Sequence, residues 1–171
     1  MPPHAPRDAS PPAVDLGRFL EAQAPVIERA LGELRAGAKR THWMWFVFPQ
    51  LEGLGRSATA RRFALGSRAE AEAYLRHPVL GGRLRECTRA VNALEGRRIG
   101  EIFAPPDDLK FHSCMTLFAH AGADNREFRE ALGKYFGSVE DERTLERLRA
   151  VDGPLREGRE YPDDPPATPR V

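Results

Sequence analysis

The chain has 171 residues, a formal net charge of +1 and 41% hydrophobic residues, a size and composition typical of one globular domain. Its longest apolar run, from Trp43 to Phe48, is far shorter than the roughly 20 residues that cross a bilayer, which argues against a membrane span. The two cysteines are too few for a disulfide framework, and the first residues lack the apolar core of a secretory signal. We therefore expect a cytoplasmic protein.

Charge is distributed unevenly along the chain. Residues 52–98 contain ten arginines and five glutamates, whereas residues 99–171 contain ten basic and fifteen acidic residues. Domains that bind nucleic acid usually have a continuous basic patch or a pI above about 9. The pI of this chain is about 7.9, and nucleic acid is therefore not a favoured partner.

Both ends of the chain are rich in proline and poor in large apolar residues. Such segments cannot bury enough apolar surface to offset the entropy of ordering. We therefore predict a disordered N-terminal tail over residues 1–14, a single helical domain over residues 15–151 and a flexible C-terminal tail over residues 152–171.

The first predicted helix covers residues 15–35. Its apolar residues recur at steps of three and four, from Phe19 to Leu34. Asp15 can cap the start of this helix, and Gly37 can end it in the left-handed conformation. We therefore expect one continuous helix here.

The aromatic segment KRTHWMWFVFPQ, at residues 39–50, is ambiguous. Its apolar run could be a buried strand, but so short a run cannot separate a strand from a buried helix. No other segment offers a pairing partner, and an isolated strand is not stable. We therefore predict a short helix that begins at about Arg40 and ends at Pro49.

Polar and proline residues then mark several helix starts. Ser57 can cap a short helix that runs to Ala64, and Ser67 with Glu70 forms a capping-box pattern. Pro78 suits the first turn of another helix.

The remaining segments are also predicted as helices. Asp107 and Asp108 suit the positive end of a helix dipole, and residues 110–120 should form a buried helix. Further helices are expected after Asn125 and from about Asp141. The predicted fold class is all-α, a compact single-domain bundle of about six to eight helices with disordered tails.

Several short motifs occur in a fixed order. They are Lys39, THWMW at 41–45, FPQ at 48–50, GLG at 53–55, Ser57, EA at 70–71, YL at 74–75, HP at 77–78, LG at 80–81, RL at 83–84, Asp107, Lys110, Ser113 and TLF at 116–118. In this order the chain resembles the bacterial family called domain of unknown function 1810, over about residues 15–151. The resemblance implies a compact, mainly helical protein without an established activity. The calpastatin label sometimes given to family members describes a disordered repeat protein, and the compact helical pattern contradicts it.

The aromatic segment has two interpretations. It can be core, with Gln50 or a helix carbonyl accepting from a buried indole N–H. It can instead line a pocket in which aromatic walls and a few polar groups hold a planar or sugar-like molecule. In that case the candidate ligand-binding residues are Lys39, His42, Trp43, Trp45, Gln50, Arg56, Ser57, Lys110, Ser113 and Phe118.

The polar residues also offer candidates for acid–base chemistry, namely His42, Asp107 and Lys110. Asp107, Lys110 and Ser113 share one side of a helix, where a local ion pair between Asp107 and Lys110 is the simpler explanation. Ser113 lacks the Gly-x-Ser-x-Gly elbow of serine hydrolases. The histidines and cysteines lack metal-site spacing, so we expect no metal or cofactor. Whether the protein is an enzyme stays open.

Two functions from different classes fit these observations. One is a protein that binds a small anionic ligand, nucleotide-like or sugar-phosphate-like, in an aromatic-lined pocket. There Arg56 and Ser57, after two glycines, could meet the anion. The other is a noncatalytic protein-interaction module with an exposed basic helix face. Its basic residues would be Arg61, Arg62, Arg83, Arg85 and Arg89.

Overall fold

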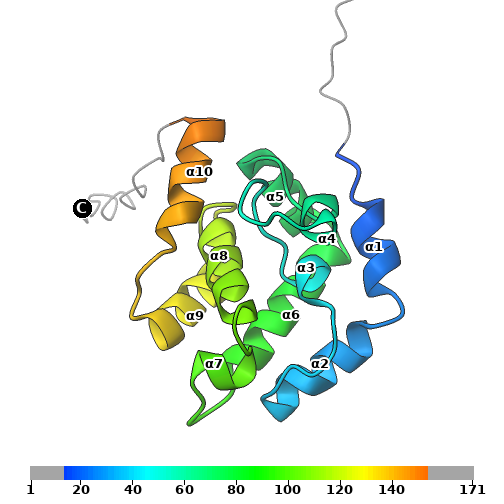
Figure 1. The fold of residues 1–171 in the computed structure, drawn as a ribbon, viewed down its shortest axis with the longest axis vertical. Coiled ribbons are helices and arrows are strands. Elements are labelled where there is room, and N and C mark those ends of the chain that lie inside the picture. The colour runs from blue at the N-terminus through cyan, green and yellow to red at the C-terminus, as the bar shows by residue number, and fades with distance from the viewer. Residues whose placement is uncertain (1–13, 154–171) are drawn as a thin grey trace, which may run out of the picture.

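A computed structural model describes residues 14–153 of the chain. The predicted tails lie outside this range, apart from Val14, Asp152 and Gly153. The described residues form helices joined by turns and contain no strand, which confirms the all-α prediction (Figure 1). The helices are α1 (Gly17–Gln23), α2 (Ile27–Ala36), α3 (Met44–Val47), α4 (Ala58–Arg62), α5 (Arg68–Arg76), α6 (Leu80–Asn92), α7 (Ile99–Ile102), α8 (Asp107–Ala119), α9 (Arg126–Phe136) and α10 (Glu142–Asp152).

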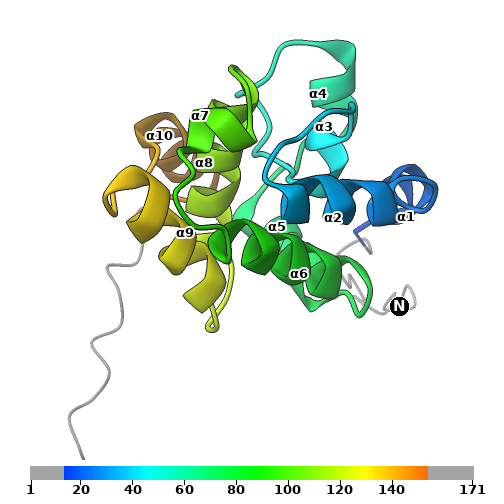
Figure 2. The same ribbon diagram turned by 90° about the horizontal axis from the view of Figure 1, so that it is seen from below.

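Helix α8 is the centre of the fold. It packs against α5, α7, α9 and α10, and residues 113–119 of this helix are all buried. Figure 1 shows α9 and α10 on one side of α8 and α3 to α5 on the other. Figure 2 shows α2 alongside α6 in the neighbouring layer. A helix that is buried on all sides needs apolar residues around its circumference, as the sequence of residues 110–120 predicted.

The prediction of one helix over residues 15–35 is wrong, because a turn divides this segment into α1 and α2. Pro25 lies in that turn. A proline has no N–H to donate and its ring clashes with the preceding helical turn, so α1 cannot continue through it. The other end agrees with the prediction, since Gly37 ends α2 with a φ of +82°.

The aromatic segment is helical only from Met44 to Val47 and therefore starts later than predicted. The backbone N–H groups of Arg40 and Thr41 both donate to the Glu33 carboxylate, at 2.6 Å each. These bonds hold the backbone before Trp43 against α2 in a turn. The Thr41 hydroxyl and the Trp43 indole are bound to the same carboxylate, so residues 40–43 keep this turn and the helix begins only at Met44.

The predicted helix caps are present at three helix starts. Ser57, Ser67 and Asp141 each accept a hydrogen bond from the backbone N–H three residues further along. The capping box at Ser67 is incomplete, because Glu70 accepts from the N–H of Gly66 instead. These caps fix the starts of α4, α5 and α10.

The junction before α6 differs from the prediction, since the helix begins at Leu80 rather than around Pro78. His77 Nδ1 accepts from the backbone N–H groups of Val79 and Leu80, at 3.1 and 3.2 Å. His77 therefore serves as a helix-junction residue, and its ring satisfies N–H groups that would otherwise lack acceptors.

Helix α10 is fastened to the segment that follows the aromatic run. Arg147 Nε donates to the carbonyl of Glu52 at 2.9 Å, and Asp152 accepts from the N–H of Arg68 at 3.0 Å. Gly53 has a φ of +93°, and a Cβ there would lie 2.6 Å from Arg147 Nε. This position therefore requires glycine. The contacts hold α10 and residues 50–55 side by side, where they form two walls of a groove.

Candidate functional site

A buried carboxylate, Glu33, organises the first half of the aromatic segment. Trp43 is 1% exposed, and its indole Nε1–H donates to Glu33 Oε2 at 2.8 Å. The Thr41 hydroxyl donates to the same oxygen at 2.8 Å, while the N–H groups of Arg40 and Thr41 donate to Oε1. The indole partner is therefore Glu33, and not Gln50 or a helix carbonyl.

The protonation of Glu33 follows from these bonds. Burial alone raises the pKa of this carboxyl, but the hydrogen bonds from Trp43, Thr41 and Arg40 stabilise the charged form and lower its pKa below the ordinary value. Glu33 is therefore ionised at neutral pH. Since both its oxygens are occupied by donors of the chain, this cluster is part of the architecture.

A second polar cluster joins the aromatic segment to α8. Asp107 Oδ2 lies 2.8 Å from Lys39 Nζ, and Asp107 Oδ1 lies 3.3 Å from Lys110 Nζ. Each lysine also faces an indole ring. The Lys39 amine lies 5.3 Å from the Trp43 ring centroid, and the Lys110 amine lies 4.8 Å from that of Trp45. One carboxylate and two aromatic faces thus fix two ammonium groups.

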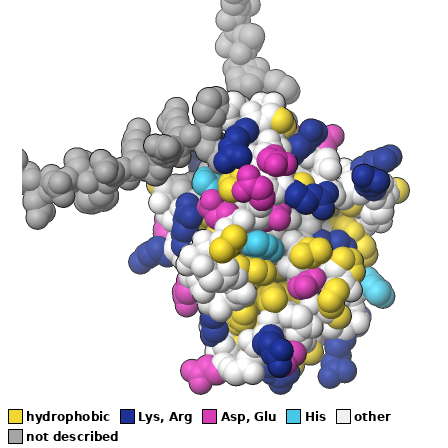
Figure 3. Space-filling view, turned by 60° about the vertical axis from the view of Figure 1, so that its left-hand side comes forward, with side chains coloured by type: hydrophobic (Ala, Val, Ile, Leu, Met, Phe, Trp, Pro, Cys, Tyr) yellow, Lys and Arg dark blue, Asp and Glu magenta, His cyan; other side chains and the backbone are white. Residues whose placement is uncertain are grey.

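A groove of about 210 Å³ begins beside Lys110. Its walls come from α8, from the start of α10 and from residues 50–55. Figure 3 views the side of the molecule to which α9 and α10 belong, where basic and acidic side chains are interspersed. The polar side chains that line the groove are Gln50, Lys110, Ser113, Asp141 and Arg143, and its apolar side chains are Leu54, Pro106 and Leu109.

A small cavity adjoins the groove on the side of the aromatic segment. It shares Gln50, Gly55 and Lys110 with the groove and is otherwise lined by Trp45, Phe48, Leu51, Ala60 and Phe63. Its volume is about 10 Å³, which is room for about one water molecule. A Cβ at Gly55 would lie 2.5 Å from the Ala60 Cβ, so glycine is needed where this wall approaches α4.

Asp141 holds the α10 wall of the groove in place. Its Oδ2 accepts from the hydroxyls of Ser113 and Thr144, at 3.1 and 2.5 Å, and from the N–H of Thr144 at 3.1 Å. Its own N–H donates to Thr116 Oγ1 at 2.9 Å. Among residues 14–153 no donor contacts its Oδ1 at hydrogen-bond distance. That oxygen is available to a molecule in the groove.

Comparison with known proteins places the chain in a family. The sequence model described as "Protein of unknown function (DUF1810)" matches residues 13–148. The chain belongs to this DUF1810 family. A similar solved structure is the conserved hypothetical protein Rv1873 from Mycobacterium tuberculosis, which is 58% identical with a TM-score of 0.78 over 78% of this chain and 96% of that chain. No curated protein matches the chain.

In this DUF1810 protein, four of the ten residues predicted to bind a ligand line the groove or its adjoining cavity. Trp45, Gln50, Lys110 and Ser113 line one or both spaces. Lys39 does not line them and instead reaches Lys110 through Asp107.

The structure places the other predicted residues elsewhere. Trp43 and Phe118 are core side chains with exposed fractions of 1% and 0%. His42 and Arg56 are exposed and do not line the groove. Ser57 caps α4. The aromatic residues of the segment thus build the core and the small cavity, whereas the apolar lining of the groove is aliphatic.

Two polar residues of the groove, Asp141 and Arg143, were not predicted as site residues. The sequence indicates Asp141 only as a helix start, and a capping role does not reveal that the same carboxylate also lines the groove. Arg143 lies in the first turn of α10, where a cation opposes the helix dipole. That unfavourable placement is the signal in the sequence that could have identified it.

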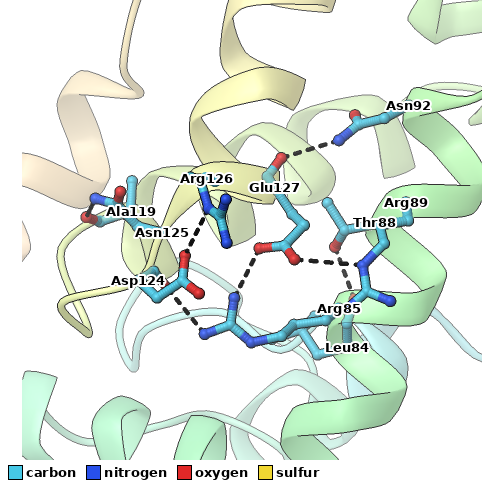
Figure 4. Close-up of polar contacts among 10 residues, drawn as sticks. All are labelled: Leu84, Arg85, Thr88, Arg89, Asn92, Ala119, Asp124, Asn125, Arg126 and Glu127. Carbon is cyan, nitrogen blue, oxygen red and sulfur yellow. Dashed lines mark hydrogen bonds and ion pairs between the residues drawn. The ribbon is translucent and has the colours of Figure 1, made fainter.

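Three of the five arginines proposed for a basic interaction face form side-chain hydrogen bonds or ion pairs within the chain. Figure 4 shows Arg85 and Arg89 converging on Glu127, with N–O distances of 2.7 and 3.3 Å. Arg85 also donates to the carbonyl of Asp124, and Arg83 donates to Gln23. The single Glu127 carboxylate thus compensates part of the positive charge on α6, and the other contacts hold the arginine side chains in place.

None of the described helices is long and apolar enough to span a membrane. Over residues 14–153, no three His, Cys, Asp or Glu side chains are grouped so that they could hold a metal ion.

Proposed function

We propose that this DUF1810 protein binds a small anionic ligand, of the nucleotide or sugar-phosphate kind, in the groove between α8, α10 and residues 50–55. The observation that carries the proposal is the pair of cations on facing walls. Lys110 projects from α8 and Arg143 from α10, and both line the same groove. An anion between them would meet positive charge from both sides.

The two cations differ in how they are held. Lys110 is preorganised by Asp107 and by the ring of Trp45, with an exposed fraction of 23%. Arg143 is exposed and makes no ion pair within the described part of the chain. A fixed ammonium group lowers the entropy lost on binding, and a mobile guanidinium group can form two parallel hydrogen bonds to a phosphate or carboxylate.

The geometry favours binding over acid–base chemistry for the predicted catalytic residues. Both oxygens of Asp107 already face lysine amines, so this carboxylate is poorly suited to accept a proton from a ligand. His42 does not line the groove. Lys110 is the one member of that set that a ligand in the groove could touch, and we assign it the contact with the anion.

The proposal is tested by thermal unfolding with inorganic phosphate and pyrophosphate. Wild type should be stabilised as ligand concentration rises, by about 2.7 kcal/mol at a hundredfold excess over Kd. Arg143→Gln should lose most of this stabilisation. Arg149→Gln is the matched control, because Arg149 lies on the same helix outside the groove and pairs with Glu142. Equal shifts in all three proteins would contradict the proposed site.

A further inference from the structure

We infer that the groove is built for a phosphorylated sugar rather than for a nucleotide. This inference rests on the proposed anion site and specifies the remainder of the ligand. It follows from three features, namely the hydrogen-bonding groups next to the cations, the kind of apolar surface in the groove and the volume available.

The groove offers acceptors beside its cations. Asp141 Oδ1 faces no donor among the described residues, although Oδ2 of the same carboxylate has three. A free carboxylate oxygen repels a phosphate but accepts from a hydroxyl group. The ligand that suits this groove therefore carries an anion at one end and hydroxyl groups close to it.

Gln50 and Ser113 also offer unused hydrogen-bonding capacity to the groove. The Gln50 side chain lines the groove without a hydrogen-bond partner in the part of the chain described, so its amide can both donate and accept. Ser113 Oγ donates to Asp141, which leaves its lone pairs free to accept. Vicinal hydroxyls of a sugar, which donate and accept, match these groups.

The apolar surface of the groove does not suit a nucleobase. It comes from Leu54, Pro106 and Leu109, which provide no aromatic face for stacking. The aromatic rings lie behind Gln50 and Lys110, around a cavity of about 10 Å³ that cannot admit a ring. Aliphatic side chains can instead cover the C–H face of a sugar.

The volume supports the same conclusion. Sites for drug-sized ligands usually measure roughly 300–1,000 Å³, and the groove measures about 210 Å³. A sugar with one phosphate is smaller than a drug-sized ligand and suits this volume. A nucleotide would leave its base outside the groove.

The test is a series of three probes, each of which contains the preceding one: inorganic phosphate, ribose 5-phosphate and AMP. Isothermal titration should show about tenfold tighter binding of ribose 5-phosphate than of phosphate, as expected for a few added hydrogen bonds. AMP should gain less than about threefold over ribose 5-phosphate, because the base finds no stacking surface.

Asp141→Asn separates the sugar contact from the phosphate contact. Asparagine can still cap α10 through its side-chain oxygen, while its NH₂ would replace the free acceptor. Phosphate affinity should be kept or raised, and the gain from ribose should disappear. Asp108→Asn is the matched control, because Asp108 lies at the start of α8 and does not line the groove.

The outcomes distinguish this inference from the proposed function. Phosphate and ribose 5-phosphate with equal Kd values would overturn the sugar assignment and leave the anion site intact. A large further gain with AMP would also overturn it, in favour of a nucleotide. Absence of binding for all three probes would contradict the proposed function itself. Loss of the affinity gained from ribose in Asp141→Asn, but not in Asp108→Asn, would support the inference.

Discussion

The Glu33 cluster and the groove beside Lys110 are both polar regions built around the same aromatic segment, but they differ in how many of their polar groups are occupied. In the Glu33 cluster, donors of the chain occupy both carboxylate oxygens. In the groove, Asp141 Oδ1 and the Gln50 amide face no partner among residues 14–153. A polar residue beside an aromatic core indicates a site only when part of its hydrogen-bonding capacity is left over.

The comparison divides residues 39–50 into two parts. Up to Trp43, the segment is held by Glu33 and its polar groups serve the fold. From Trp45 to Gln50, it faces the small cavity and reaches the groove. Lys39 connects the two regions, because it lies over Trp43 and pairs with Asp107, which in turn faces Lys110.

The largest expected difference between the two regions is the cost of losing each tryptophan. Trp43→Ala should lower the free energy of unfolding by about 3–5 kcal/mol, since it removes a fully buried ring and one of the donors to the Glu33 carboxylate. Trp45→Ala should cost about half as much, because that ring is only partly buried. Urea unfolding followed by circular dichroism measures both. Equal costs would contradict the division of the segment.

A smaller effect, dependent on pH, is expected at Glu33. Glu33→Gln replaces one acceptor oxygen by an NH₂ group that faces existing donors, and should cost about 2–3 kcal/mol at pH 7. The folded pKa of Glu33 is lowered from its ordinary value of 4.5. Its contribution to stability is therefore full above that value and is lost as the pH falls through the folded pKa.

The measurement is the difference in unfolding free energy between wild type and Glu33→Gln across an acid series. The difference should shrink only below pH 4.5, the ordinary value of the Glu33 pKa. A difference that stays constant through the acid range would show that charge on Glu33 does not stabilise the fold. Glu130→Gln, at an exposed position of α9, is a suitable control.

The smallest effect is expected at the link between the two regions. Asp107→Asn removes the charge that pairs with Lys39 and Lys110, whose side chains are 9% and 23% exposed. Stability should fall by about 1 kcal/mol. Phosphate binding should become weaker, because Asp107 no longer holds the Lys110 ammonium group in place. Unchanged or tighter phosphate binding would show that Asp107 does not preorganise Lys110.

The helical architecture could largely be predicted from the sequence, because caps and periodicity are local signals. Ser57, Ser67 and Asp141 act at the positions that their residue types indicated. Two of the three errors at helix boundaries also have local or near-local causes. Pro25 breaks the first predicted helix, and the Glu33 carboxylate holds residues 40–43 in a turn outside the short aromatic helix.

The candidate site was less accessible to sequence reasoning, because its walls come from segments far apart in the chain. The groove joins Gln50 to Lys110 and Arg143, and no periodic pattern connects those positions. Glu33 was overlooked for a related reason. It follows Ala30 by three residues on the apolar face of α2, which marks it as buried, but its partners Thr41 and Trp43 lie beyond the helix.

The long-range hydrogen bonds that hold α10 against the rest of the fold affect the order in which the chain folds. The bonds from Arg147 to Glu52 and from Arg68 to Asp152 connect residues 95 and 84 positions apart. Closing such long loops costs entropy that local helices do not lose. During synthesis, the aromatic core can pack before Asp141 has left the ribosome, whereas the groove lacks its third wall until α10 emerges. Under the proposed function, the ability to bind the ligand is therefore acquired last, and ligand present at that stage would favour the docking of the final helix.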